Sequence, residues 1–440
     1  MGLQFNAIPV VFVISGFVVT PLVTKPKSTQ AFTPLYTVDG NLAYDRLGYS
    51  IITLDDLDGD GKKDILVGAP NRNPIYPQPG HAYVVSAANG NILRTHTGIN
   101  YADRYGRALG HLGDLNNDGI PEYTVGATWG ELPDPQALDV PGTVTIFDGR
   151  TGNVIETLAG NAEGECFGGG FARLNDVDGD GTQDFVVASR FGNLLNGDPA
   201  TAHGEIRILS GKTLTYLSTT TGTLAGDYLG GEPMGTAAVG DQNGDGIIDI
   251  AAGAWAASGN AKRGDVAIIS GADGAVLHWL HGDKAGDQFG WAVGSLPDMD
   301  GNGRPEIVVG APYAGLRHTG EVSVISAQTG NKLYTFKGTV RNAGFGFSFA
   351  TMPGDNNGLG DLIVVGSPYH NKAAGRVQLI SVRTGGVVAT VSGDSQGDQF
   401  GHAVAAVDDI TDTGIASVAV GAIGAPGGSE QGRMTVYKIE

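Results

Sequence analysis

Cysteine, clustered histidine and catalytic motifs are all scarce in this 440-residue sequence. Its one cysteine, Cys166, excludes any disulfide within the chain, and we expect it to be a small buried apolar residue. Of nine histidines, only His278 and His281 lie close together, on a segment with the pattern of a strand and turn. No Gly-x-Ser-x-Gly, His-Glu-x-x-His or phosphate-binding loop occurs. The sequence therefore gives no indication of an enzyme, and we expect the protein to have no enzymatic activity.

Basic residues are scarce as well, which argues against a nucleic-acid partner. There are 27 Lys and Arg against 46 Asp and Glu, and the formal net charge is −19. A chain of this sign repels a phosphate backbone. Seventeen of the carboxylates occupy five short loops, so five bound divalent cations would reduce the net charge to about −9. Much of the acidity therefore has a local explanation.

The five loops share one pattern of oxygen-bearing side chains. They span 56–64, 114–122, 176–184, 241–249 and 298–306, and are called loops 1 to 5. Asp, Asn or Glu occupies positions 1, 3, 5 and 9, and glycine always occupies position 6, where a sharp bend needs a positive φ. Oxygen ligands at alternate positions, with the carbonyl of position 7, suit a hard cation. No loop contains a soft ligand, which disfavours zinc and copper and leaves calcium ahead of magnesium or manganese.

The predicted calcium ligands number five in each loop. They are Asp56, Asp58, Asp60, Lys62 and Asp64 in loop 1; Asp114, Asn116, Asp118, Ile120 and Glu122 in loop 2; Asp176, Asp178, Asp180, Thr182 and Asp184 in loop 3; Asp241, Asn243, Asp245, Ile247 and Asp249 in loop 4; and Asp298, Asp300, Asn302, Arg304 and Glu306 in loop 5. At position 7 the backbone carbonyl is the expected ligand. A single loop of this composition could be a plain turn, but five copies in register favour metal sites.

An EF-hand is excluded, because its position 12 is a bidentate Glu and its loop joins two helices. Here position 12 is Val67, Val125, Val187, Ala252 or Val309. The runs that follow the loops are β-branched or aromatic, so each loop is predicted to join two buried strands.

A longer repeat of 55 to 65 residues surrounds the loops. Before each loop stands Phe-Gly or a variant, as at Phe289-Gly290, and after it stands Gly-Ala-Pro or a variant, as at 310–312. A hairpin such as 320–338 completes a unit of four short strands. Two further copies contain degraded loops, at 354–361 (loop 6) and 409–417 (loop 7), which we do not expect to bind calcium strongly.

Seven four-stranded units predict an all-β, seven-bladed propeller over residues 32–440. The C-terminal segment 432–440 is half of a hairpin, and 34–40 resembles the missing half. One blade is therefore expected to contain strands from both termini, which closes the ring and pairs its edges.

The Phe-Gly, calcium-loop and Gly-Ala-Pro pattern resembles FG-GAP repeats, and the chain is similar to the N-terminal propeller of integrin α subunits. That resemblance implies calcium ligands in loops 1 to 5, on one face of the propeller, with calcium in a structural role. No leg domain, membrane span or inserted domain is present, and only one cysteine occurs. We therefore expect a stand-alone relative rather than an integrin subunit.

Residues 1–31 differ from the repeats. The apolar run at 7–23 is short for a membrane span and contains Pro9 and Pro21, and 29–31 offers a small-residue cleavage site. We expect a signal peptide, with an uncleaved anchor or a strand-like tail as alternatives, since no Lys or Arg precedes the run. A secreted or cell-surface location would also supply calcium.

The face opposite the loops is expected to carry the partner site, because its connections are long and uneven, at 71–79, 129–141, 191–203 and 255–263. The predicted function is a protein-interaction or adhesion module, expected to be monomeric; the alternative is a sugar-binding, lectin-like propeller. Aromatic residues follow the Gly-Ala-Pro position at Trp129, Phe191, Tyr313 and Tyr369, either to grip a partner or to pack between blades. The Arg263-Gly264-Asp265 triplet fits the repeat template and is interpreted as coincidence.

Overall fold

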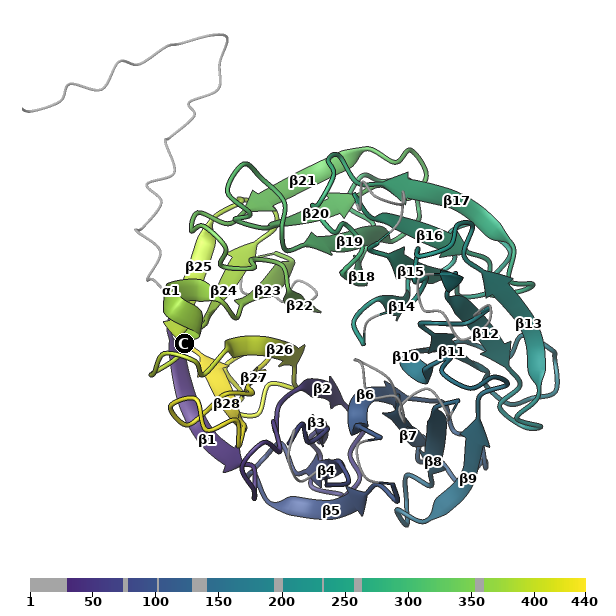
Figure 1. The fold of residues 1–440 in the computed structure, drawn as a ribbon, viewed down its shortest axis with the longest axis horizontal. Helices are drawn as coiled ribbons and strands as arrows, with labels where there is room; N and C mark the ends of the chain where they lie inside the picture. The colour runs from purple at the N-terminus through teal and green to yellow at the C-terminus, as the bar shows by residue number, and fades with distance from the viewer. Residues whose placement is uncertain are drawn as a thin grey trace, which may run out of the picture.

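A computed structural model describes residues 30–73, 78–100, 103–128, 141–193, 201–231, 233–256, 263–352 and 360–440. Seven antiparallel four-stranded sheets surround a central axis, so the predicted seven-bladed β-propeller is confirmed (Figure 1). Each sheet is one blade, and its strands follow one another in the chain from the axis outward. The exception is blade 7, in which the outermost strand comes from the N-terminus.

The strands, from the innermost to the outermost, are as follows. Blade 1 contains β2 (Ser50–Thr53), β3 (Ile65–Ala69), β4 (His81–Val85) and β5 (Ile92–Thr97); blade 2 contains β6 (Tyr105–His111), β7 (Tyr123–Ala127), β8 (Thr143–Phe147) and β9 (Val154–Ala159); blade 3 contains β10 (Phe167–Arg173), β11 (Phe185–Ser189), β12 (Glu205–Leu209) and β13 (Tyr216–Thr221). Blade 4 contains β14 (Thr236–Ala238), β15 (Ile250–Ala254), β16 (Asp265–Ile269) and β17 (Val276–His281); blade 5 contains β18 (Ala292–Leu296), β19 (Glu306–Ala311), β20 (Glu321–Ile325) and β21 (Lys332–Lys337). Blade 6 contains β22 (Ser348–Met352), β23 (Leu362–Ser367), β24 (Arg376–Ser381) and β25 (Val387–Ser392); blade 7 contains β26 (Phe400–Ala406), β27 (Val418–Ala422), β28 (Arg433–Ile439) and β1 (Phe32–Asp39). A single turn, α1 (His370–Ala373), follows β23.

The second strand of each blade is buried along its whole length, as the apolar runs after the loops predict. Its side chains pack against the neighbouring blades. One cluster, for example, joins Ile65 and Val67 of blade 1 to Ala419 and Val436 of blade 7. The outermost strands are largely exposed, as in β9. The apolar core is therefore a ring of contacts between blades.

The two glycines of the repeat motif contact each other across blade boundaries. A Cβ added to Gly68 would lie 1.9 Å from the Gly106 carbonyl oxygen of the next blade. Five further pairs repeat this approach: Gly126 with Gly168, Gly253 with Gly290, Gly310 with Gly346, Gly366 with Gly401, and Gly421 with Gly48. Gly106 also has a φ of +89°, which L-residues with side chains rarely adopt. The motif is thus explained by blade packing.

The two ends of the chain close the ring. Strand β1 pairs with β28 in antiparallel register, from Phe32 opposite Ile439 to Asp39 opposite Arg433 (Figure 1). Arg433 also forms an ion pair with Asp39, with 2.6 Å between Nε and Oδ1. The predicted blade with strands from both termini is therefore confirmed.

Predictions for residues 1–29 lie outside the described residues, and the signal peptide over 1–31 stays a prediction. Pairing of the chain ends reaches Ala31, whose N–H donates to the Glu440 carbonyl at 2.6 Å. Within the described part of the chain, no helix has both the length and the apolar character to cross a membrane.

Candidate metal centres

Loops 1 to 5 each join the first and second strands of a blade, as predicted. Because successive strands are antiparallel, the Gly-Ala-Pro connections between the second and third strands lie on the opposite face. The connections that enter each blade lie on that opposite face too. The turn between the third and fourth strands lies beside the loop; Ser86 Oγ, for example, donates to Asp60 Oδ2 at 3.4 Å.

Each loop is held in shape by its own carboxylates. In loop 1, Asp56 accepts the N–H groups of Gly59 at 2.7 Å and Gly61 at 2.8 Å. Asp60 Oδ1 accepts the Lys62 N–H at 2.9 Å. The position 1 carboxylate bonds the position 6 N–H in all five loops. The loops are therefore curled around their acidic side chains.

Three loops gather carboxylates closely enough to hold a metal ion. Oxygen atoms from positions 1, 3 and 9 lie within 4.8 Å of one another in loops 1, 3 and 5. The residues are Asp56, Asp58 and Asp64; Asp176, Asp178 and Asp184; and Asp298, Asp300 and Glu306. Loops 2 and 4 place Asn116 and Asn243 at position 3, where the amide offers one neutral oxygen.

The position 9 carboxylate is the buried member of each cluster. Asp64 is fully buried, and its Oδ2 accepts the Leu57 N–H at 2.8 Å. Its Oδ1 lies near the Ala87 N–H without a well-formed hydrogen bond. Glu122 Oε1, near the Gly149 N–H, and Glu306 Oε2 are likewise buried without a well-formed hydrogen bond among the described residues. An oxygen of this kind is well suited to a cation, because an unpaired buried acceptor is costly.

Burial raises the pKa of these position 9 carboxyls. The pKa of Asp64 rises to about 7 because burial disfavours the charged form, and the nearby Asp58 and Asp60 add to the rise. Burial likewise raises the pKa of Glu122 to about 7. The pKa values of Asp184, Asp249 and Glu306 move in the same direction for the same reason. Without a cation, each loop therefore holds an acid that ionises reluctantly.

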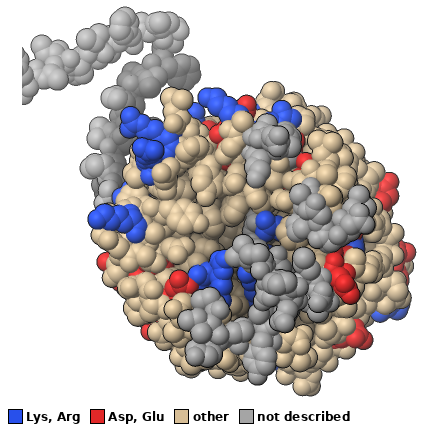
Figure 2. All heavy atoms as spheres, in the orientation of Figure 1, with Lys and Arg blue, Asp and Glu red and all other residues tan. Residues whose placement is uncertain are grey.

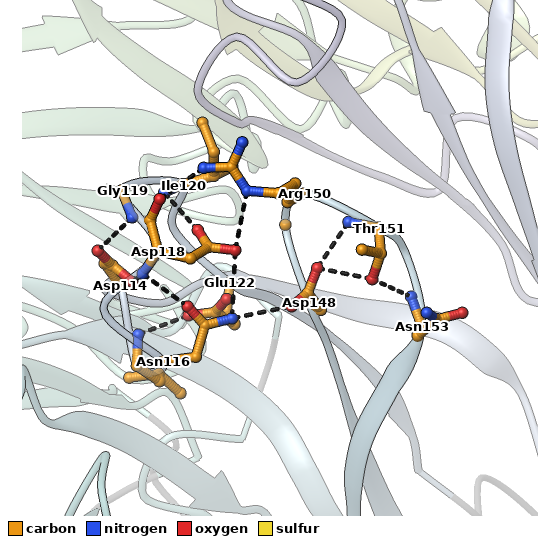
Figure 3. A network of polar contacts seen from close by, with 12 residues as sticks. Asp114, Asn116, Asp118, Gly119, Ile120, Glu122, Asp148, Arg150, Thr151 and Asn153 are labelled. Atoms are coloured by element: carbon orange, nitrogen blue, oxygen red, sulfur yellow. Dashed lines mark hydrogen bonds and ion pairs between the residues drawn. The ribbon is translucent and has the colours of Figure 1, made fainter.

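The side chain of Arg150, a residue that the sequence did not single out, lies against loop 2. The Arg150 guanidinium lies 3.1 Å from Asp118 Oδ2, the position 5 ligand, while Asn116 Nδ2 donates to Asp148 Oδ2 at 2.8 Å (Figure 3). The Ile120 N–H and the Arg150 charge hold the pKa of Asp118 below its ordinary value. Arg150 comes from the turn between β8 and β9. The corresponding turn of blade 3 carries Lys212, whose Nζ donates to the Asp180 carbonyl at 3.0 Å.

Replacing Arg150 should strengthen calcium binding at loop 2. In the Arg150→Ala variant, Asp118 no longer faces a positive charge, so its carboxylate becomes available to the ion. We expect calcium affinity at that loop to rise about threefold to tenfold at low salt, measured by isothermal titration calorimetry. An Arg341→Ala variant, on the opposite face, is the control. Unchanged binding in Arg150→Ala would show that Arg150 does not compete with calcium.

A lysine of loop 1 makes contact with loop 7. Lys62 Nζ, which belongs to loop 1, donates to the Asp409 carbonyl at 2.8 Å and to Asp412 Oδ1 at 3.0 Å. The positive charge of this lysine opposes cation binding at loop 7, where weak calcium binding stays a prediction. Residues 354–359 of loop 6 lie outside the described residues, and weak calcium binding at this loop stays a prediction.

Several other sequence-predicted residues have structural roles. Cys166 is buried beside Phe191, Ala202 and Tyr228, as expected of a small apolar side chain. Asp265 is buried at the start of β16 and lies 2.9 Å from His281 Nδ1, so the Arg-Gly-Asp triplet is part of the blade. Trp129 and most of the long connections, at 74–77, 129–140, 194–200 and 257–262, lie outside the described residues.

Comparison with protein families places this geometry in context. The FG-GAP repeat model matches residues 47–86 and 289–325, which include loops 1 and 5. Integrin alpha-4 of Xenopus laevis is 32% identical over 146 residues, covering 30% of this chain and 13% of that protein. Integrin alpha pat-2 of Caenorhabditis briggsae is 28% identical over 222 residues, covering 46% of this chain and 17% of that protein. The chain thus matches a small part of the length of these relatives.

A solved structure supports the fold alone. The crystal structure of BBS1N in complex with ARL6DN, soaked with lead, aligns over 93% of this chain and 97% of its own, with a TM-score of 0.55 and 10% sequence identity. Together, the ring of blades, the paired glycines and the matched repeats define an FG-GAP repeat propeller. In particular, two segments of the chain match the FG-GAP repeat model, and the propeller is similar to integrin α chains over part of its length.

Proposed function

We propose that this chain is a calcium-stabilised protein-interaction module that acts outside the cell or at its surface. The carboxylate clusters of loops 1, 3 and 5 support the calcium part of the proposal. Loops 2 and 4, which have one amide in place of a carboxylate, would be weaker sites. Calcium bound at the loops would be structural, since it neutralises carboxylates that the fold crowds together.

Similarity to integrin α chains supports the proposed role in protein interaction. It also supports the proposal that the chain has no enzymatic activity. The relatives named above give no support to the sugar-binding alternative. The partner would dock on the face opposite the loops, where the connections between blades are long. Because the matched segments cover 13–17% of the integrin chains, the partner of this chain need not be one of theirs.

Binding of the calcium-loaded propeller to intact cells of its source tests this function. Labelled protein should bind in calcium, and trypsin treatment of the cells should remove the binding while glycosidase treatment leaves it. Binding that survives trypsin and disappears with glycosidase would instead establish the sugar-binding alternative. Absence of binding to treated and untreated cells alike would contradict an adhesive role.

A further inference from the structure

A hollow lies at the centre of the face opposite the metal loops. Its volume is about 210 Å³, and its wall includes Tyr49, Trp291, Phe347, Tyr369 and His402, with Arg46 and Arg72. Figure 2 shows this face, with Lys and Arg side chains at the edge of the central depression. The hollow combines residues from blades 1, 5, 6 and 7 and from the segment that enters blade 4, so it exists only in the closed ring.

Aromatic rings form one side of the hollow as a continuous belt. The ring centroids of Trp291 and Phe347 lie 5.1 Å apart, those of Phe347 and His402 5.1 Å, and those of His402 and Tyr49 4.6 Å. Burial lowers the pKa of His402 to about 4, with a smaller contribution from the charges of Arg46 and Arg107 and a partly opposing hydrogen bond to the Tyr49 carbonyl. His402 is therefore neutral at physiological pH, and the belt is apolar.

Arginines form the other side. Arg46 and Arg72 line the hollow, and Arg104 and Arg107 adjoin it in a smaller depression. Arg46 is paired with Glu430, whereas Arg72 is exposed and makes no ion pair with a described residue. In a chain with a net charge of −19, this local concentration of positive charge is unusual.

Two other acidic groups near these arginines, Asp45 and Asp103, are turned into the protein. Asp45 is fully buried, and its Oδ2 accepts the N–H groups of Asn41 and Leu42. Asp103 is buried as well and accepts the Tyr105 N–H at 3.0 Å. Neither carboxylate is exposed in the hollow, so an incoming anion would meet the arginines.

We propose that this hollow binds a short segment of a protein partner in which a carboxylate stands next to an aromatic or large apolar side chain. The carboxylate would pair with Arg72 at the rim, and the apolar side chain would pack against the aromatic belt. The hollow is smaller than the roughly 300–1,000 Å³ of most small-molecule sites, which suits one anchoring side chain of a larger partner. This inference rests on the proposed protein-binding function and specifies the chemistry of its site.

Fluorescent peptides test the chemistry directly on the calcium-loaded protein. The probes are Ser-Glu-Phe-Glu-Ser, its Glu-Ala-Glu and Lys-Phe-Lys counterparts, and digalacturonate as an anionic sugar. We expect only the Glu-Phe-Glu peptide to bind measurably by fluorescence anisotropy. The Arg72→Glu variant should weaken that binding at least about tenfold, and Tyr369→Ala should weaken it as well. Both side chains are exposed, so circular dichroism should show both variants folded.

The Arg341→Glu variant is the matched control. Arg341 is exposed in the connection between β21 and β22, on the same face but outside the hollow, and its reversal should change binding less than about twofold. Binding of the Lys-Phe-Lys peptide, binding of digalacturonate without the Glu-Phe-Glu peptide, no binding of any probe, or equal effects of Arg72→Glu and Arg341→Glu would each overturn the inference.

Cell binding by the Arg72→Glu variant separates this inference from the proposed function. Loss of trypsin-sensitive cell binding in Arg72→Glu, with retention in Arg341→Glu, supports both. Full retention in Arg72→Glu would place the partner elsewhere on the propeller and overturn the inference while the protein-binding function stands.

Discussion

Removing calcium should lower the melting temperature of this propeller on the order of 5–10 °C. A site whose free ligand is at 100 times its Kd stabilises the folded state by about 2.7 kcal/mol, so three such sites would contribute about 8 kcal/mol. For a domain of this size, that free energy corresponds to a shift of the stated order. Thermal unfolding followed by circular dichroism, in millimolar calcium and in excess chelator, measures it.

Two comparisons make the calcium result specific. Magnesium alone should restore little of the melting temperature, because it demands octahedral geometry and gives up its waters reluctantly. A triple variant, Asp56→Asn, Asp176→Asn and Asp298→Asn, removes the position 1 carboxylates of the three clusters and should respond weakly to calcium. An identical melting temperature in calcium and chelator would remove the metal assignment for all five loops.

The chelated protein should also become less stable as the pH rises. The pKa of Asp64 is raised from near 4 in the unfolded chain to about 7 in the folded state. At a pH below about 4 the carboxyl is protonated in both states, so it does not change the free energy of unfolding. Between about 4 and 7 the folded state binds the proton more tightly, and stability falls as the pH rises through this window. With calcium bound, the ionised form is required, and the fall from pH 5 to pH 8 should shrink or reverse. Chemical denaturation at the two pH values measures the difference.

Deleting the strand that closes the ring should have the largest effect of any local change. A chain that starts at Asn41 lacks β1, which leaves β28 as an exposed edge and uncovers part of the core of blade 7. We expect a loss of at least about 4 kcal/mol in the free energy of unfolding, or recovery only as aggregate. Urea denaturation of the soluble fraction measures it.

A chain that starts at Gln30 is the control for this deletion, because it retains all the residues that pair in β1. It should match the full-length chain in stability. A synthetic peptide of residues 30–40, added to the shorter chain, should restore part of the loss by pairing with β28. Equal stability of the two shortened chains would show that ring closure contributes little.

The fold could be predicted from the sequence because the same local chemistry is repeated. Glycine at the sixth position of each loop, the apolar run after it and the hairpin turn all act within one blade. The half-hairpin at 432–440 and its partner at 34–40 then required closure. The loop ligands could be identified for the same reason, since the residues of each cluster lie within nine positions of one another.

Features that depend on distant residues were missed. Arg150 reaches Asp118 across 32 positions, and Lys62 reaches Asp412 across 350. An alignment of the hairpin turns would have placed Arg150 and Lys212 at equivalent positions and drawn attention to both. The belt of the central hollow carried a comparable signal that was not used, because Tyr49, Trp291 and His402 each directly follow the glycine of a Phe-Gly motif or its variant.

The pairing of β1 with β28 also determines how the molecule would respond to mechanical load. Tension applied through the residues before Gln30 acts first on the end of β1 that pairs Phe32 with Ile439. A pull outward from that end would separate the two strands one residue pair at a time, rather than shearing all the pairs together. A propeller tethered by its N-terminal segment would therefore yield at blade 7 under low force, and the aromatic and arginine sides of the central hollow would lose their alignment as the ring opened.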